Sequence, residues 1–373
     1  MPDYPGTERD DGTRFVINNT AYCGTGLSST WMDLGDFYAF DMNTDSWSAT
    51  TSLPLGEERQ YACGFSSNTS GFIFGGYSNG NFLNDLWKYD PGTDNWTEQT
   101  SLPGDGRSGA TFFTINDTTY IIGGRTSTID AITEVWAYDM TSDTWFQKND
   151  FPYDSLWRAA GASYNQTGYL LFGRSPSNEY HNEFYNYDPN SDSWSQLSSF
   201  PGIGRTYSTL NSAQGKLLAV AGLDSLGESY NDMWQFDPLT GNWHELAFLP
   251  ANKRRGGIAF TSNTAIYYTT GIDLTNTRLT ETWKCENPTN LFEKEQLEFI
   301  IYPNPVGEAL EIDPLSIPFT VDSYIIYNQA GKQLVKFQGE IPEKLDVSSL
   351  MTGIYILELR GDNRTSRSKL MKL

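Results

Sequence analysis

The feature that most constrains this chain is a repeat with a period of 49 residues. One aromatic series advances by that step through Trp47, Trp96, Trp145, Trp194 and Trp243. A second follows it through Tyr38, Trp87, Trp136, Tyr185, Trp234 and Trp283. Two acidic series share the step: Asp36, Asp85, Glu134, Glu183, Asp232 and Glu281, and Asp41, Asp90, Asp139, Asp188 and Asp237. A period near 50 residues indicates a propeller blade or a similar unit, which buries its faces only against neighbouring copies.

Each repeat is predicted to contain four short strands. In the clearest copy they cover residues 107–113, 119–124, 134–139 and 144–147, with Asn116 and Asp117 in the first turn. The strand sets begin at six arginines: Arg9, Arg59, Arg107, Arg158, Arg205 and Arg254. The sequence therefore predicts an all-β fold, a six-bladed β-propeller over residues 1–286.

The order of motifs within a repeat resembles the Kelch repeat. Leucine or phenylalanine with proline comes first, then arginine, a strand ending in Gly-Gly, acid-x-Trp-x-Tyr-Asp and a final tryptophan. Gly75-Gly76 and Gly123-Gly124 keep the glycine pair, and the other repeats relax it. The match covers residues 4–286. The resemblance implies a Kelch-type propeller (galactose-oxidase/Kelch-like) in which loops of one face touch a ligand.

Closure of the ring has two interpretations. The sixth repeat carries Phe292 where the period places a tryptophan, so either Asn290–Glu295 form a degraded fourth strand or residues ahead of Met1 supply it. Residues 1–10 do not resemble the basic and then apolar start of a signal peptide. We therefore expect the N-terminus to be truncated or mature.

A second domain is predicted at residues 298–373, after a linker at 287–297. Short alternating segments at 309–312, 323–328, 334–338, 344–347, 353–360 and 366–372 favour a small immunoglobulin-like β-sandwich. The motifs Tyr302-Pro-Asn-Pro305, 327–332, 345–355 and 369–373 closely resemble the type A C-terminal sorting domain of type IX secretion substrates. The resemblance implies export from a Bacteroidota-type bacterium to the cell surface, cleavage in the linker by a sortase, and attachment to lipopolysaccharide.

Charge and hydropathy narrow the partners. With 25 basic and 46 acidic residues the net charge is −21, which argues against nucleic acid, and no apolar run is long enough for a transmembrane segment. The ligand should be neutral, cationic or presented on a surface. The three cysteines, Cys23, Cys63 and Cys285, leave at least one thiol unpaired within the chain, and we expect all three to be buried thiols.

The arginine series is predicted to surround the mouth of the central channel, because each arginine begins an innermost strand. Two roles stay open: the side chains either bond to backbone carbonyls and neighbouring acids, or touch the ligand. The acids of the Asp36 series lie two strand spacings away, about 10 Å, so we expect them to cap turns rather than to pair with arginine or to bind a metal.

Irregular loops on the same face supply the other candidate ligand contacts. Trp31 and Trp157 are the two tryptophans outside the repeat, and each is either a contact for a sugar or protein or an anchor for its loop. Polar and aromatic side chains gather in the neighbouring loops. These further candidates are Arg125, Arg174, Tyr180 and His181.

Catalytic signatures are few. The two histidines, His181 and His244, are distant in the repeat register, which argues against a galactose-oxidase-like copper site, and we expect no metal or cofactor. No nucleophile elbow, zinc spacing or phosphate loop occurs. The sequence therefore favours a secreted or surface-attached binding protein for a glycan or protein. The alternative is a sugar epimerase or mutarotase of the sialic-acid-mutarotase type, acting through the arginines.

Overall fold

The computed structural model describes residues 1–288, 299–313, 316–317, 320–328, 333–339, 342, 344–361 and 364–373. The chain is divided into two compact units, Met1–Leu291 and Phe292–Leu373. The described residues form β-strands and turns without an α-helix, so the predicted all-β class is confirmed. No helix among them could cross a membrane.

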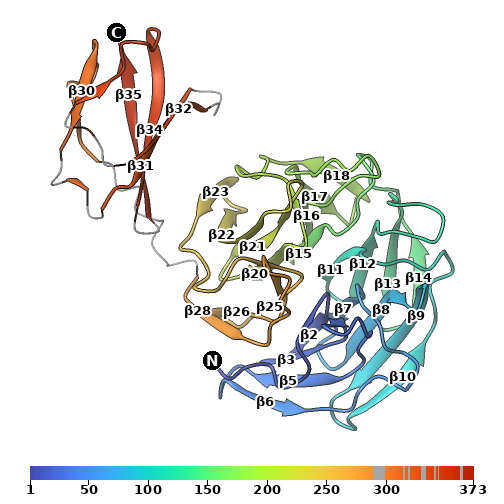
Figure 1. Ribbon diagram of the computed structural model, residues 1–373. Coiled ribbons are helices and arrows are strands. Elements are labelled where there is room, and N and C mark those ends of the chain that lie inside the picture. The colour runs from blue at the N-terminus through green and yellow to red at the C-terminus, as the bar shows by residue number, and fades with distance from the viewer. Residues whose placement is uncertain are drawn as a thin grey trace. The chain divides into compact units, whose positions relative to one another are not determined.

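The larger unit contains six antiparallel sheets arranged as blades (Figure 1). The first four have four strands each, in consecutive meander order, and the fifth has four such strands within a larger seven-stranded sheet. Their strands are β2 (Thr13–Ile17), β3 (Thr20–Gly24), β5 (Phe37–Asp41) and β6 (Ser46–Ala49); β7 (Cys63–Ser66), β8 (Gly71–Ser78), β9 (Asn81–Asp90) and β10 (Asn95–Gln99); β11 (Thr111–Ile115), β12 (Thr118–Ile122), β13 (Val135–Asp139) and β14 (Thr144–Gln147); β15 (Ala160–Tyr164), β16 (Thr167–Leu171), β17 (Phe184–Asp188) and β18 (Ser193–Gln196); and β20 (Thr209–Ala213), β21 (Lys216–Asp224), β22 (Ser229–Asp237) and β23 (Asn242–Glu245). The sixth has β25 (Ile258–Thr261), β26 (Ala265–Thr269) and β28 (Thr282–Glu286).

The first strands of these sheets surround a common axis. Each packs against the first strand of the next sheet, and β25 of the sixth packs against β2 of the first, which closes the ring. Five short two-residue strands lie at one end of the axis: β1 (Arg9–Asp10), β4 (Leu27–Ser28), β19 (Arg205–Thr206), β24 (Arg254–Arg255) and β27 (Ile272–Asp273). One of them, β24, pairs with β22 and so joins the sixth blade to the fifth. The fourth-strand candidate Asn290–Glu295 and most of the predicted linker lie outside the described residues.

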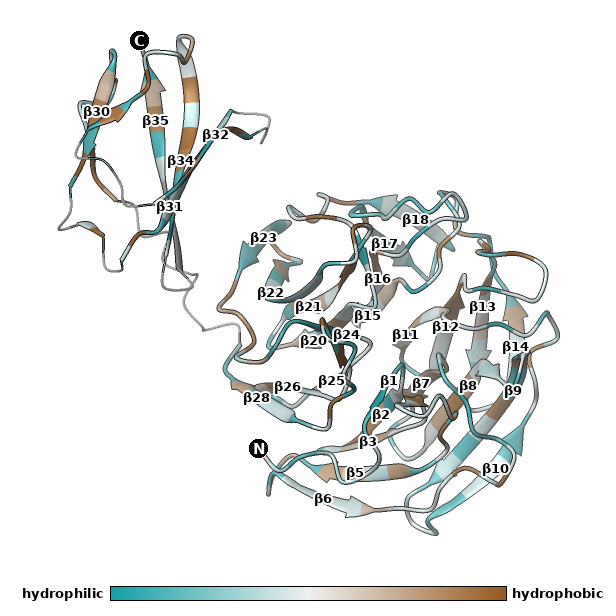
Figure 2. Cartoon of the chain, viewed as in Figure 1, coloured by the Kyte–Doolittle hydropathy of each residue, from teal (hydrophilic) through white to brown (hydrophobic). Residues whose placement is uncertain are grey.

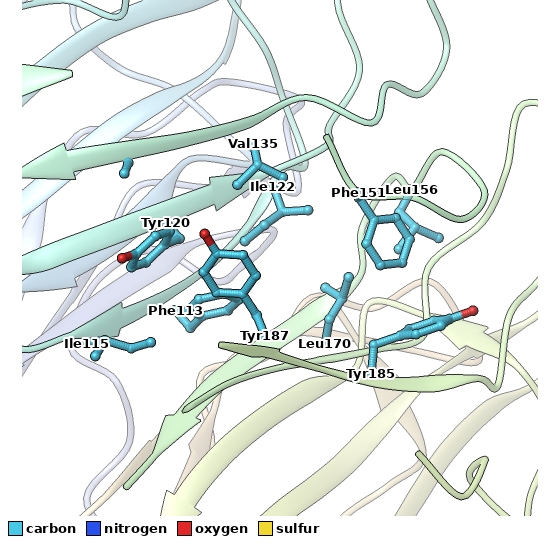
Figure 3. Packing of buried hydrophobic residues seen from close by; sticks show 11 residues of the cluster. Phe113, Ile115, Tyr120, Ile122, Val135, Phe151, Leu156, Leu170, Tyr185 and Tyr187 are labelled. Atoms are coloured by element: carbon cyan, nitrogen blue, oxygen red, sulfur yellow. The ribbon is translucent and has the colours of Figure 1, made fainter. Parts of the chain in front are cut away.

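The core is built between blades. Side chains alternate along β11, where Thr111, Phe113 and Ile115 are buried, as expected for a strand that faces a neighbouring sheet. Phe113 packs beside Tyr120 and against Tyr187 of the following blade, with ring centroids 5.4 and 5.8 Å away (Figure 3). Apolar residues colour the inner strands brown in Figure 2. A single blade therefore cannot bury its own aromatic residues, which explains why the repeat recurs.

Three of the fourth-strand tryptophans form a hydrogen bond between their blade and the blade before it. The indole N–H of Trp96 donates to the carbonyl oxygen of Thr51 at 2.9 Å, and Trp145 donates to Thr100 at 2.8 Å. Trp243 donates to Ser198 in the same way. The hydrogen-bonded residues are 45 positions apart, and the 49-residue step is the interval at which this bond between adjacent blades recurs.

An aspartate in the last turn of a blade forms a second link of this kind. Asp143 accepts from the Tyr138 hydroxyl at 2.8 Å and from the backbone N–H of Thr100, in the preceding blade, at 3.1 Å. Hydrogen bonds to a charged acceptor contribute more than neutral ones. Asp143 has a φ of 52°, a conformation that glycine also adopts easily.

Replacing Asp143 by glycine is expected to lower the free energy of unfolding by about 1–2 kcal/mol. Glycine keeps the backbone conformation and removes the acceptor. Denaturant unfolding followed by tryptophan emission measures the loss in the propeller, since all 11 tryptophans lie between residues 31 and 283. Asp143→Asn, which retains the acceptor oxygen, is the control. Equal midpoints for the glycine variant and the wild type would show that the link contributes nothing.

The described residues of the smaller unit form two sheets. One contains β29 (Ile301–Tyr302), β30 (Ala309–Ile312) and β33 (Leu345–Asp346); the other contains β31 (Ser323–Asn328), β32 (Gln333–Gln338), β34 (Gly353–Gly361) and β35 (Arg364–Lys372). The Asn304 side chain donates to the Lys369 carbonyl at 2.7 Å and accepts from the Met371 N–H at 2.8 Å. The Tyr-Pro-Asn-Pro motif and the chain end are therefore joined. The turn at 329–332 lies outside the described residues.

Candidate functional site

Five arginines of the predicted series form ion pairs inside their own blades. The pairs are Arg9–Asp36, Arg59–Asp85, Arg107–Glu134, Arg205–Asp232 and Arg254–Glu281, with N–O distances of 2.6–2.8 Å. The arginine side chains are 0–3% exposed. The expectation that arginine and acid lie too far apart is therefore wrong. The long arginine side chain crosses the end of the second strand, where in four blades it also donates to a backbone carbonyl.

The acids of the Asp36 series do not cap turns as expected. In four blades the carboxylate also accepts from the indole N–H two residues later, as in Trp234 to Asp232 at 3.0 Å. The bond from Arg254 lowers the pKa of Glu281 below its ordinary value, against the effect of burial. The five arginines therefore hold the strands of their blades together, and we leave them out of the proposed site.

The fourth blade departs from this arrangement. Leu156, not Arg158, stands 49 residues after Arg107 and 49 before Arg205. Leu156 is buried in the core between blades three and four. Glu183, the acid of this blade, faces the His181 ring nitrogen Nδ1 at 3.3 Å instead of an arginine. Arg158 lies two positions further along and was assigned by the sequence analysis to the wrong register.

Arg158 belongs to a different series, which the sequence analysis missed. The residue two places after the arginine position has a left-handed backbone in every blade. These residues and their φ angles are Asp11 (58°), Tyr61 (60°), Gly109 (59°), Arg158 (55°), Tyr207 (56°) and Gly256 (64°). We call them the mouth ring, because all six line the same end of the central cavity.

Backbone hydrogen bonds connect members of the mouth ring. The N–H of Asp11 donates to the Gly256 carbonyl, Tyr61 to Asp11, Gly109 to Tyr61 and Arg158 to Gly109, at 2.8–3.1 Å. Tyrosine and arginine rarely occupy this conformation, whereas glycine does so without cost. Strained residues of this kind concentrate at functional sites. Bulky side chains in positions suited to glycine therefore point to a function for the mouth ring.

Aromatic rings surround the Arg158 guanidinium. Its central carbon lies 3.7 Å from the ring centroid of Tyr207, 3.8 Å from Trp157 and 4.0 Å from Tyr61. Arg158 is 9% exposed, and its Nε and Nη1 atoms have no hydrogen-bond partner among the described residues. Burial lowers the pKa of Arg158 from its ordinary value, while Tyr61 and Asp11 act in the opposite direction. Cation–π contacts thus stabilise this charge without an ion pair within 4.0 Å in the described part of the chain.

The cavity beneath the mouth ring has a volume of about 190 Å³. Its walls are the first strands of the blades, and its charged lining residues are Asp11, Arg14 and Arg158. Arg14 extends from the first blade to the Ala259 carbonyl at 2.7 Å and the Asn211 side chain at 2.9 Å. Burial raises the pKa of Asp11 to about 7, with the Asp10 charge acting in the same direction. The cavity therefore contains two cations and one carboxyl group that is partly neutral at pH 7.

The other residues predicted to contact the ligand differ in their distance from the cavity. The Trp157 ring contacts two guanidinium groups, with the central carbon of Arg158 3.8 Å and that of Arg174 4.4 Å from its centroid. Trp31 is 76% exposed and lies 5.0 Å from Arg278. Arg125 forms an exposed ion pair with Asp130 at 2.9 Å, outside the cavity lining.

Tyr180 and His181 lie in the fourth blade and do not line the cavity. Tyr180 pairs with Arg174 through the backbone, and His181 lies between Asp154 and Glu183. The three cysteines are free and buried, and burial raises the pKa of Cys285 to about 11. Tyr180 and His181 therefore stabilise loops of the fourth blade, and the cysteines belong to the core, so none of these side chains lines the cavity.

A signal for the mouth ring is present in the sequence. The steps between the six arginines are 50, 48, 51, 47 and 49 residues, and the irregular steps of 51 and 47 flank Arg158. Moving Arg158 out of the series restores two steps of 49. The residue two places after each arginine position could then be read as one variable position per blade.

Comparisons with known proteins agree with the predicted families. Residues 5–151 match the KLHDC2/KLHL20/DRC7 Kelch-repeats domain, and residues 204–247 match the Kelch motif. Residues 300–372 match the secretion system C-terminal sorting domain. The predicted Kelch repeats and sorting domain are therefore confirmed.

A solved structure described as "Structure of YjhT" is similar to this chain with a TM-score of 0.65 and 18% identity. The match covers 76% of this chain and 96% of that one, and at this identity it shows the fold alone. No curated protein matches the chain.

Proposed function

We propose that this chain, in which Kelch repeats are joined to a secretion-system sorting domain, is an exported protein that binds the terminal unit of a glycan at the mouth ring. The observation that carries this proposal is the buried Arg158 guanidinium, enclosed by Tyr61, Trp157 and Tyr207 at the mouth of a small cavity. Binding pockets for small ligands are concave and carry a few convergent polar groups. The exposed Trp31 indole near the mouth offers a flat surface for a further sugar ring.

The route to the cell surface is part of the same proposal. The sorting domain directs export to the cell surface or the medium. We further propose that the type IX machinery of a Bacteroidota-type bacterium exports the chain, that a sortase removes the domain by cleavage near residues 287–297, and that the propeller is attached to lipopolysaccharide. A glycan-binding propeller would then face the environment.

Replacing Tyr207 by glycine is expected to weaken glycan binding about tenfold, because one wall of the cavity and one ring against Arg158 are lost. The scaffold should be unaffected, since Gly109 and Gly256 occupy the same position in other blades. A glycan array on the full chain identifies the ligand, and titration calorimetry measures the change. Tyr153→Ala, an exposed tyrosine outside the cavity lining, is the control. A chain that binds no glycan, or a glycine variant that binds as the wild type does, would contradict the proposal.

The alternative is a sugar mutarotase, and Asp11 is the observation that favours it. A carboxyl group with a pKa of about 7 suits general acid and base catalysis near neutral pH. Opening and closing a sugar ring requires one proton to be donated by a general acid and one to be removed by a general base. NMR measurement of anomer exchange, with Asp11→Asn as the comparison, separates this activity from binding alone.

A further inference from the structure

We propose that the contact between the sixth and first blades is an ionic latch, at which the propeller opens before any other pair of blades separates. We call this contact the closing seam, because it joins the two ends of the repeat. Three ion pairs cross it: Lys284–Asp45, Arg278–Asp10 and Arg255–Asp10. The latch is separate from the proposed function and does not depend on which ligand the mouth ring binds.

Ion pairs between blades are confined to the closing seam. Among the described residues of the propeller, every ion pair that joins two blades crosses this seam, and the others lie within one blade. The Nζ atom of Lys284 lies 2.9 Å from Asp45, and the guanidinium groups of Arg278 and Arg255 lie 2.6 and 3.6 Å from Asp10. Each of the six contacts between neighbouring blades has its own apolar cluster, so charge is what distinguishes this one.

The last-turn aspartate of the first blade has unusual partners. In the next three blades this aspartate accepts from a tyrosine hydroxyl five residues earlier and from a backbone N–H of the preceding blade; these residues are Asp94, Asp143 and Asp192. The corresponding positions before Asp45 are Phe40, which has no hydroxyl group, and Pro2, which has no N–H. Two residues of the sixth blade donate instead: the hydroxyl of Tyr267 at 3.0 Å and the ammonium group of Lys284 at 2.9 Å. A cation from across the seam thus takes the place of the usual neutral donor.

The other carboxylate of the latch lies beside the mouth ring. The residues immediately before the six mouth-ring positions are Asp10, Gln60, Ser108, Trp157, Thr206 and Arg255. Two of these six are charged, and these two have opposite signs and face each other across the closing seam. Asp10 is 2% exposed and also accepts from the Nε atom of Arg278. A carboxylate buried to this extent is costly without compensating cations, and both of its cations belong to the sixth blade.

Ion pairs make the closing seam easier to separate than an apolar contact alone. Charges that separate regain their hydration, which offsets much of the attraction that is lost. The five other contacts join blades that follow one another along the chain, so a separated pair stays close and closes again. The sixth and first blades lie at opposite ends of the propeller sequence. Opening therefore begins at this seam.

Opening of the closing seam takes the mouth ring apart. The N–H of Asp11 donates to the carbonyl oxygen of Gly256 across the seam at 2.8 Å, and these two residues directly follow Asp10 and Arg255. The mouth ring is therefore complete only when the latch is closed. Any ligand that binds the complete ring stabilises the closed state, because it binds that state and not the open one.

Hydrogen exchange of the full chain, measured by mass spectrometry, tests the latch, because amides exchange when a local contact opens. The peptide covering residues 4–12 reports on the closing seam. The peptide covering residues 102–110 reports on the boundary between the second and third blades, since Gly109 donates to Tyr61 there as Asp11 donates to Gly256. We expect Lys284→Met to raise exchange in the first peptide about tenfold and to leave the second unchanged.

Lys216→Met is the matched control. The Lys216–Asp237 pair has an N–O distance of 2.7 Å and side chains that are 26% and 14% exposed, against 20% and 30% for Lys284–Asp45, but it lies within the fifth blade. This variant should leave both peptides as in the wild type. Equal exchange of the seam peptide in the two lysine variants would overturn the role of the ion pair. An equal rise in both peptides of the Lys284 variant would show that all blades open together, which would also overturn the latch.

The wild type provides a test that does not depend on the folding of a variant. Its seam peptide should exchange faster than the peptide covering residues 102–110, after correction for the intrinsic rates of the two sequences. The reverse order would contradict opening at the closing seam. Arg255→Met, which removes a side chain that is 24% exposed, should increase this difference in the same direction as Lys284→Met.

Discussion

Replacing Arg205 by methionine is expected to lower the free energy of unfolding of the propeller by about 3–5 kcal/mol. Arg205 and Asp232 form the most enclosed of the arginine–acid pairs, with side chains 3% and 12% exposed and an N–O distance of 2.7 Å. Methionine fills a similar volume but leaves the carboxylate of Asp232 with the indole N–H of Trp234 as its remaining hydrogen-bond donor among the described residues. A buried charge that loses its counter-ion accounts for the loss.

Denaturant unfolding followed by tryptophan emission measures this change. Arg125→Met removes an ion pair that is 45% and 49% exposed, and should cost less than about 1 kcal/mol. The double variant Arg205→Met with Asp232→Leu should recover most of the stability, because neither charge is then left unpaired. If Arg205→Met is no less stable than Arg125→Met, the pair does not hold the blade together.

Replacing Leu357 by aspartate is expected to abolish export while leaving the propeller intact. Leu357 is fully buried in the core of the smaller unit, beside Leu310 and Leu370. A charged side chain there costs several kcal/mol, comparable to the whole stability of so small a domain. The machinery would then meet an unfolded tail. The propeller core is built from other clusters and should unfold at the same denaturant concentration as in the wild type.

Immunoblots of cells and medium from a host with the secretion machinery measure the distribution of the protein. Met351→Asp places the same charge at a position that is 81% exposed, and should be exported normally. Tryptophan emission again reports on the propeller alone, because the smaller unit contains no tryptophan. Normal export of the Leu357 variant would mean that a short linear motif, and not a folded domain, is recognised.

The periodic part of the fold was predictable because one residue type serves one contact in each blade. The fourth-strand tryptophans recur every 49 residues, and Trp96, Trp145 and Trp243 each donate to a carbonyl of the preceding blade. The predicted last two strands of the third blade agree closely with β13 and β14. The first predicted strand began too early, at residue 107. The left-handed turn at Gly109 separates Arg107 from β11.

The site was harder to predict, because residues near in sequence lie on different faces of the same turn. Arg107 turns into its blade, whereas the residue two places later lines the channel, and the uneven steps around Arg158 are the one sequence signal identified for this difference. Arg158 was identified as a candidate for an incorrect reason, as a sixth member of the structural series. Asp11, Tyr61 and Tyr207 were missed because their side chains differ between blades, and a search for repetition passes over positions that vary.

The side chains that would determine ligand specificity in the mouth ring are different residues from those that hold the blades together. Its six positions share one backbone conformation, and backbone hydrogen bonds join five of them, so the identity of each side chain has little bearing on where the next is placed. Read around the channel, the ring spells Asp-Tyr-Gly-Arg-Tyr-Gly. Each of these residues can be substituted separately, and glycine removes the side chain at that position, while the arginine–acid ion pairs of the blades stay unchanged. Combining substitutions at these six positions offers a direct route to propellers that bind new ligands with an unchanged scaffold.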